Sequence, residues 1–177
     1  MKTIFCLLFL LMAYPIVAEP KKFSPGPLIK NYGPHAQVTQ SNPISQEQHF
    51  KVAFDVADLG DVNQVNRKFE SLARFLNMHV AAGIKAENIR LALIVHGKAS
   101  YGVLKDKFFR QKFSVANPNQ MLLQELMRNQ VRLMICGQSA AYYEINNEQL
   151  LDGVEMALSA MTAHAVLQQQ GYTINPF

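Results

Sequence analysis

Three polar residues at the ends of apolar runs are the first candidates for chemistry in this sequence. Asp58, His96 and Cys136 each follow a run of apolar, often β-branched residues, a pattern typical of buried strands. A thiolate is a strong nucleophile, and an imidazole or backbone N–H groups beside it lower the pKa of the thiol. For Cys136 we expect these groups to be His96, Lys98 and the N–H groups of residues 137–139. The pattern indicates nucleophilic chemistry on sulfur.

Each functional interpretation has a structural alternative. Cys136 is either a sulfur-handling nucleophile, an inert thiol buried in the core, or one half of an intermolecular disulfide. His96 either acts as a base or orienter for Cys136 or sets the turn before Gly97 through a hydrogen bond to a loop carbonyl. Gln138 and Ser139 either donate hydrogen bonds to a bound anion or persulfide, or satisfy the backbone of their own loop.

No other motif indicates a metal or a cofactor. Cys136, His96 and Asp58 lack the close ligand spacing of metal-binding helices and hairpins, so no metal site is predicted. The sequence around Gly97 does not form a P-loop, and no Gly-x-Gly-x-x-Gly follows the first strand. His164 lies near the apolar face of the last predicted helix, where a histidine is usually a core or interface residue but is also within reach of the sheet. We therefore expect no cofactor.

The first 18 residues predict a cleaved secretory signal. Lys2 gives a positive start, residues 4–12 are apolar, and residues 16–18 form a small-residue exit. The apolar run is shorter than the roughly 20 residues that a membrane span needs. Cys6 leaves with the signal, so Cys136 is the only cysteine of the expected mature chain. We expect that chain to be periplasmic or otherwise exported, with no integral membrane segment after signal cleavage.

The rest of the chain predicts an extended arm followed by one domain. Residues 19–48 are rich in Pro, Gly, Asn, Ser and Gln, which indicates an arm without regular structure. Residues 49–177 have the length of a single domain. Apolar residues such as Phe23 and Tyr32 favour an arm that lies across a surface, and in an oligomer that surface could belong to a neighbour. Lys and Arg number 17 against 13 Asp and Glu without a basic stripe, so nucleic acid is not expected as a partner.

Alternating strand and helix patterns must position the candidate residues. Strands are predicted at residues 51–57, 89–95, 131–135 and 172–175. Helices are predicted at 61–83, at 117–129, at 147–151 and at 152–171, the last with Leu158 and Met161 facing inward. This alternation predicts an α/β fold with a parallel sheet wrapped on both faces. The carboxyl ends of the strands then share one edge, which brings Asp58, His96 and Cys136 together.

Several segments resemble the DsrE/DsrF-like family. They are the strand end 94–97, the helix 122–126, the strand end 135–139 and the tail 157–172. The resemblance covers roughly residues 50–177, and the segment 25–33 resembles that of exported members. It implies a three-layer αβα, flavodoxin-like fold and assembly into trimers or hexamers. Family members that move sulfur carry it as a persulfide on a cysteine, and Cys136 occupies a comparable loop.

Two functions are consistent with these patterns. In the first, an exported homo-oligomer binds or relays sulfur on Cys136, in exchange with a sulfur donor or acceptor protein, and His96, Gln138, Ser139 and Asp58 are binding residues. In the second, the chain is a non-catalytic oligomeric binding or assembly module whose cysteine is structural. The reactivity of Cys136 in the folded protein distinguishes the two.

Overall fold

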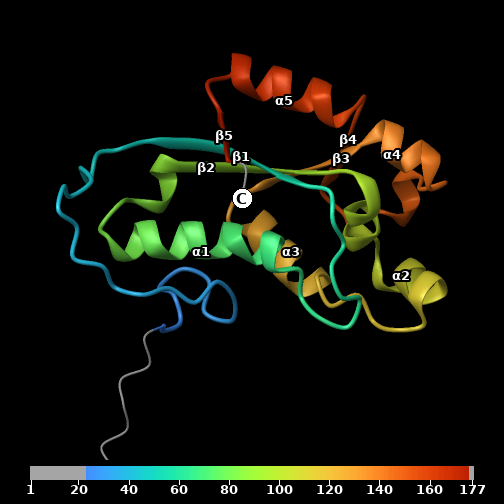
Figure 1. Cartoon of the computed structure of the whole chain (residues 1–177), viewed down its shortest axis with the longest axis horizontal. Helices are drawn as coiled ribbons and strands as arrows, with labels where there is room; N and C mark the ends of the chain where they lie inside the picture. Colours follow the sequence, from blue (N-terminus) through green and yellow to red (C-terminus); the bar gives the residue numbers. More distant parts are fainter. Residues whose placement is uncertain (1–22, 176–177) are drawn as a thin grey trace, which may run out of the picture.

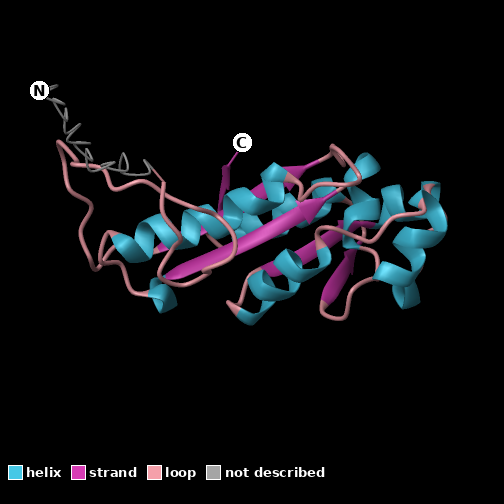
Figure 2. Ribbon diagram, turned by 90° about the horizontal axis from the view of Figure 1, so that it is seen from below, coloured by secondary structure: helices cyan, strands magenta, loops and turns pink. Residues whose placement is uncertain are grey.

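A parallel five-stranded sheet forms the centre of the computed structural model, which describes residues 23–175 (Figure 1). The strands lie in the order β4-β3-β2-β1-β5, and every neighbouring pair is parallel. Figure 2 shows the strands side by side between the helices. Their bounds are β1 (Phe50–Val56), β2 (Ile89–Val95), β3 (Arg132–Cys136), β4 (Val154–Ala157) and β5 (Thr173–Asn175).

The order of the strands explains where the helices lie. Strands β1 to β4 follow one another in one direction across the sheet, and right-handed crossovers then place the connecting helices on one face. Strand β5 lies on the far side of β1, so the connection from β4 to β5 runs back across the sheet. This reversal places α5 on the other face. Figure 1 shows α1 and α3 below the sheet and α5 above it. The helices are α1 (Arg67–Ala81), α2 (Asp106–Phe113), α3 (Gln120–Arg128), α4 (Gly137–Tyr142) and α5 (Ala160–Gln169), with 3-10 turns η1 (Ala86–Asn88), η2 (Gly97–Val103) and η3 (Asn147–Gln149).

The two faces of the sheet bury very different amounts of apolar surface. Most of the core lies between the sheet and the helices α1 and α3, and it includes Phe54 and Leu93 from the sheet and Phe69 from α1. The face under α5 has a small separate cluster that consists of Ala53, Ala92, Ile94, Met134, Ala163 and Leu167. The predicted three-layer, flavodoxin-like α/β class is confirmed. We call the face covered by α1 and α3, with the large cluster, the thick face, and the face covered by α5, with the small cluster, the thin face.

The prediction for the last helix is wrong. Residues 154–157 form the edge strand β4, paired with β3, and α5 begins only after Ser159, whose hydroxyl accepts a hydrogen bond from the Thr162 N–H at 3.0 Å. Leu158 and Met161 are 73% and 80% exposed and do not face inward. Pairing with a neighbouring strand decided the structure of this segment, and that pairing is not visible in a local capping pattern.

Two other helix starts were placed too early, and one helix was missed. Helix α1 begins after Asn66, whose side chain accepts from the Lys68 N–H, whereas Asp61 closes a separate turn by accepting from the Asn63 N–H. Helix α3 begins at residue 120 rather than 117. The stretch 97–116, for which no helix was predicted, contains η2 and α2, and α2 buries Phe109 in the core.

Residues 23–49 form no named helix or strand, and residues 28–34 are bonded to α1 of their own chain. The Asn77 side chain on α1 is fully buried and satisfies several backbone groups of this segment, accepting from the N–H groups of Leu28 and Ile29 and donating to the carbonyls of Ile29, Tyr32 and Gly33. One side chain thus replaces the hydrogen bonds that a strand partner would give. The predicted signal, residues 1–18, lies outside the described residues.

No helix within residues 23–175 is long and apolar enough to cross a membrane.

Candidate functional site

Cys136 is the last residue of β3 and the residue that precedes α4. It is the free cysteine of the described part of the chain and is 6% exposed. The turn into α4 passes close to β4, because a Cβ atom added at Gly137 would lie 2.5 Å from the Ala157 carbonyl oxygen. Glycine is therefore required directly after the cysteine, and the sulfur is held at the edge of the sheet between β4 and β2.

Groups at the starts of two helices favour the charged form of the Cys136 thiol. Burial raises the pKa of the thiol, but the N–H groups of Ser139 and Ala160, the Ser139 hydroxyl and the Gln138 N–H outweigh it, so the pKa lies below its usual value. Ser139 and Gln138 belong to the first turn of α4, and Ala160 is the first residue of α5. Helix starts present free N–H groups and partial positive charge, which favour a thiolate over a thiol.

Ser139 also connects the cysteine to the neighbouring strand. Its hydroxyl oxygen accepts a hydrogen bond from the Gly97 N–H at 3.0 Å, directly after β2. The side-chain amide of Gln138 donates to the Leu158 carbonyl at 3.2 Å and so links α4 to the segment before α5. Both side chains thus bond the backbone of neighbouring segments, and their role toward a bound anion stays a prediction.

His96 lies beside Cys136 at the edge of the sheet. In the β2–β3 register Val95 is opposite Ile135, so His96 and Cys136 are at the next position along the two strands. Neither His96 nor Lys98 is among the groups that shift the pKa of Cys136. Lys98 is exposed. The N–H groups and the hydroxyl of the two helix starts take that part instead.

Asp58 does not reach the other candidate residues. Its side chain is exposed and accepts a hydrogen bond from the Gly60 N–H at 3.3 Å within its own turn. The carboxylate that does contact His96 is Asp55, which lies inside β1 and is half-buried, with Oδ2 2.9 Å from His96 Nε2. The signal was present in the sequence, since Asp55 is the one acidic residue within a mostly apolar strand.

His164 joins the same carboxylate from the other side. Its Nε2 lies 2.7 Å from Asp55 Oδ1, so one carboxylate bridges two imidazoles that come from β2 and α5. Burial raises the pKa of the Asp55 carboxyl, and the hydrogen bonds from His164 and His96 more than offset this, so its pKa is lowered. Asp55 is therefore ionised at neutral pH and accepts from both rings.

The family model for the DsrE/DsrF-like family matches residues 62–176. The chain belongs to the DsrE/DsrF-like family. A protein of unknown function from Methanobacterium thermoautotrophicum, MTH1491, is 17% identical, with a TM-score of 0.52 over 72% of this chain and 99% of that chain. The ychN protein from E. coli is 21% identical, with a TM-score of 0.48 over 73% of this chain and 99% of that chain. A search of curated proteins finds no match.

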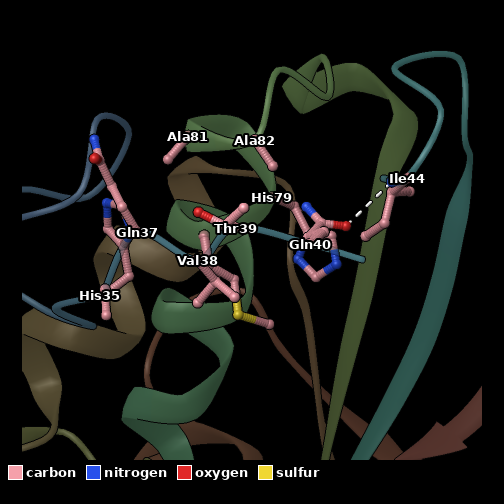
Figure 3. A pocket seen from close by; sticks show the side chains of 11 residues that line it. His35, Gln37, Val38, Thr39, Gln40, Ile44, His79, Ala81 and Ala82 are labelled. Carbon is pink, nitrogen blue, oxygen red and sulfur yellow. Dashed lines mark hydrogen bonds between the residues drawn. The ribbon is translucent and has the colours of Figure 1, made fainter. Parts of the chain in front are cut away.

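One pocket of this DsrE/DsrF-like chain lies away from Cys136. It has a volume of about 710 Å³ and is lined by residues 35–40, by Ile44 and by the end of α1 (Figure 3). His79 lines it, stacked on Phe75 and bonded through Nδ1 to the Phe75 carbonyl at 2.7 Å. Burial lowers the pKa of His79, against the opposing effect of that carbonyl. The lining contains no cysteine, and none of it belongs to the Cys136 site.

Exposed apolar side chains lie on the elements next to the cysteine in the chain and in the sheet. Leu158 and Met161 lie on either side of Ser159 and Ala160, where α5 begins, and Tyr142 ends α4 with 80% of its surface exposed. Within the described residues of this DsrE/DsrF-like chain, no group of three or more His, Cys, Asp and Glu side chains is arranged to hold a metal ion. The arrangement around Cys136 can therefore stabilise an anionic sulfur.

Proposed function

We propose that Cys136 accepts sulfane sulfur and carries it as a persulfide. The observation that carries this proposal is the convergence of N–H groups from α4 and α5, with the Ser139 hydroxyl, on the one sulfur atom. These donors favour the thiolate that must attack, and they favour the anionic terminal sulfur of the product in the same way. Membership of the DsrE/DsrF-like family supports the same chemistry.

The proposed transfer needs no external oxidant. The Cys136 thiolate attacks the outer sulfur of a donor of the type R–S–S⁻, a new S–S bond forms, and the donor S–S bond breaks. The electron pair of that bond leaves with the donor as a thiolate, or as sulfite when the donor is thiosulfate. The outer sulfur then resides on Cys136 until an acceptor thiolate removes it by the same exchange.

We also propose that the protein works after export. The sequence pattern of residues 1–18 supports cleavage, and a single thiol in an oxidising compartment persists only if it is protected or used. The small exposure of Cys136, 6%, supports protection from random disulfide formation. In this proposal the partners are a sulfur donor or acceptor protein and further copies of the chain.

The alternative function is a non-catalytic binding or assembly module. The exposed apolar side chains of Leu158, Met161 and Tyr142 favour it, because such surfaces are typical of contacts with other proteins. The low exposure of Cys136 is also compatible with a structural thiol. The alternative predicts a cysteine that is protected from alkylation in the folded state.

Incubation with a sulfane-sulfur donor and weighing of the intact protein tests the proposal. The mature chain is treated with thiosulfate or with inorganic polysulfide, and we expect a mass gain of one sulfur that Cys136→Ser abolishes. Iodoacetamide labelling across pH should show a midpoint below that of a cysteine in an unfolded peptide, because the pKa is lowered. A wild-type protein that gains no sulfur from either donor would sink the proposal.

A further inference from the structure

The carboxylate of Asp55 is held between two histidines from different parts of the fold. His96 Nε2 contacts Oδ2 at 2.9 Å, and His164 Nε2 contacts Oδ1 at 2.7 Å. An ionised carboxylate only accepts hydrogen bonds, so both rings carry their proton on Nε2. In the neutral form of either ring, Nδ1 is then left as an acceptor. The bridge fixes the tautomer and the orientation of both histidines at once.

The sheet register places His96 between Asp55 and Cys136. Successive side chains of a strand alternate between its two faces, and Ile94 and Met134 belong to the cluster under α5. His96 and Cys136, two positions further on, share that face at neighbouring strands about 4.8 Å apart. A carboxylate, an imidazole and a thiol therefore follow one another across β1, β2 and β3.

The second histidine connects the bridge to α5. This helix buries only Ala163 and Leu167, so its apolar contacts with the sheet are few. The N–H of Ala160, the first residue of this helix, helps to lower the pKa of the Cys136 thiol, and His164 lies about one turn further along. The bond from His164 to Asp55 therefore holds the turn that delivers this N–H.

One ring nitrogen of His164 is buried at an energetic cost. Its Nδ1 is buried and has no hydrogen-bond partner among the described residues. An apolar side chain at this position would fill the space without leaving a polar atom unsatisfied. The bond to Asp55 is the interaction that the ring makes in return for that cost.

We propose that Asp55 and His164 are positioning residues of the Cys136 site, Asp55 by fixing the His96 imidazole beside the sulfur and His164 by fixing the start of α5 over it. The inference rests on the proposed function of Cys136. A proton released by the thiol passes to His96 Nδ1, and His96 returns it to the leaving sulfur of the donor. The Asp55 carboxylate stabilises the imidazolium formed between these two steps.

Two readouts separate positioning from simple stabilisation. Alkylation by iodoacetamide depends on the thiolate, whereas sulfur uptake also depends on the proton that His96 exchanges. We expect Asp55→Asn to slow sulfur uptake about 10-fold while alkylation at neutral pH changes less than about threefold. His96→Gln should give a similar loss, and the double variant should lose nothing further, because the two side chains act as one unit.

The chain offers a matched control in Asp58→Asn. This carboxylate lies three residues after Asp55, is exposed and bonds only within its own turn, so both rates should stay within about twofold of wild type. His164→Gln should instead move the alkylation midpoint to higher pH, because the Ala160 N–H shifts away from the sulfur. If circular dichroism shows that Asp55→Asn fails to fold, His164→Gln still tests the proposal.

The outcomes distinguish this proposal from the proposed function. If wild type gains no sulfur but its thiol reacts, sulfur transfer fails, and an unchanged alkylation midpoint in His164→Gln then overturns the positioning role as well. If wild type gains sulfur and Asp55→Asn gains it within about twofold of the same rate, only the positioning role is overturned. Additive losses in the double variant would overturn the coupling of Asp55 to His96.

Discussion

The two faces of the sheet differ in what they hold: one holds most of the apolar core and the other the candidate site. The face under α1 and α3 is filled by large apolar side chains such as Phe54, Phe69 and Leu93. The face under α5 has a small apolar cluster and, at its carboxyl edge, the polar residues Asp55 and Cys136. The topology supplies one crossover helix to this second face, so the sulfur site lies where apolar coverage is thinnest.

This difference suggests that stability and chemistry are separable on the thick face and coupled on the thin one. A change in the thick core should cost free energy of unfolding without altering Cys136. A change under α5 should alter both, because the helix that covers the thin face also supplies the Ala160 N–H to the sulfur.

The largest effect is expected from Phe69→Ala on α1. Phe69 is fully buried in the thick core, and its removal should lower the free energy of unfolding by about 3–5 kcal/mol, measured by urea denaturation. The alkylation rate of Cys136 in the folded protein should not change. A faster or slower thiol in this variant would break the separation between the two faces.

Leu167→Ala on α5 should have a smaller effect on stability and a clear effect on the thiol. Leu167 is 1% exposed, and its truncation should cost about 2–3 kcal/mol and raise the pH midpoint of Cys136 alkylation. Val166→Ala, on the exposed side of the same helix, is the matched control and should stay within about 0.5 kcal/mol of wild type. An unshifted midpoint in Leu167→Ala would contradict the coupling.

The sequence predicted the thick face better than the thin one. The strand at 89–95 was predicted with the bounds that β2 has, because a continuous apolar run is decided by burial on both faces. The helix expected from Asp152 failed because residues 154–157 pair with β3, a contact between residues more than 20 positions apart. Local capping patterns carry no information about such a partner.

The same reason explains what was missed at the site. The position of Cys136 at the end of a strand was predictable, because the mostly apolar run 131–135 directly before it indicates a buried strand. Asp58 rather than Asp55 was predicted, because the residues that bind ligands in parallel sheets are expected after the strands and Asp55 lies inside one. The meeting of His96 and His164 on Asp55 depends on the placement of α5, and only the tertiary structure reveals it.

Ser159→Ala should have an effect of about 1 kcal/mol on stability. The Ser159 hydroxyl accepts from the Thr162 N–H and caps α5, and loss of such a cap frays the first helical turn. The alkylation midpoint of Cys136 should rise as the Ala160 N–H becomes less fixed. Ser159→Asn restores a capping oxygen and should return both quantities toward wild type, whereas equal effects of Ala and Asn would contradict a capping role.

The smallest effect is expected from Glu155→Gln at the rim of the thin face. Glu155 accepts two hydrogen bonds from Arg132, at 2.7 and 3.0 Å, which ties β4 to β3 at a partly exposed position. Such pairs contribute about 1 kcal/mol or less and are screened by salt, so urea denaturation in 1 M salt should nearly abolish the difference from wild type. A loss greater than about 2 kcal/mol that persists in salt would mean that charge, rather than the small cluster under α5, holds this side of the sheet. The two faces would then differ in the type of interaction that stabilises them, apolar packing on the thick face and ion pairs on the thin face.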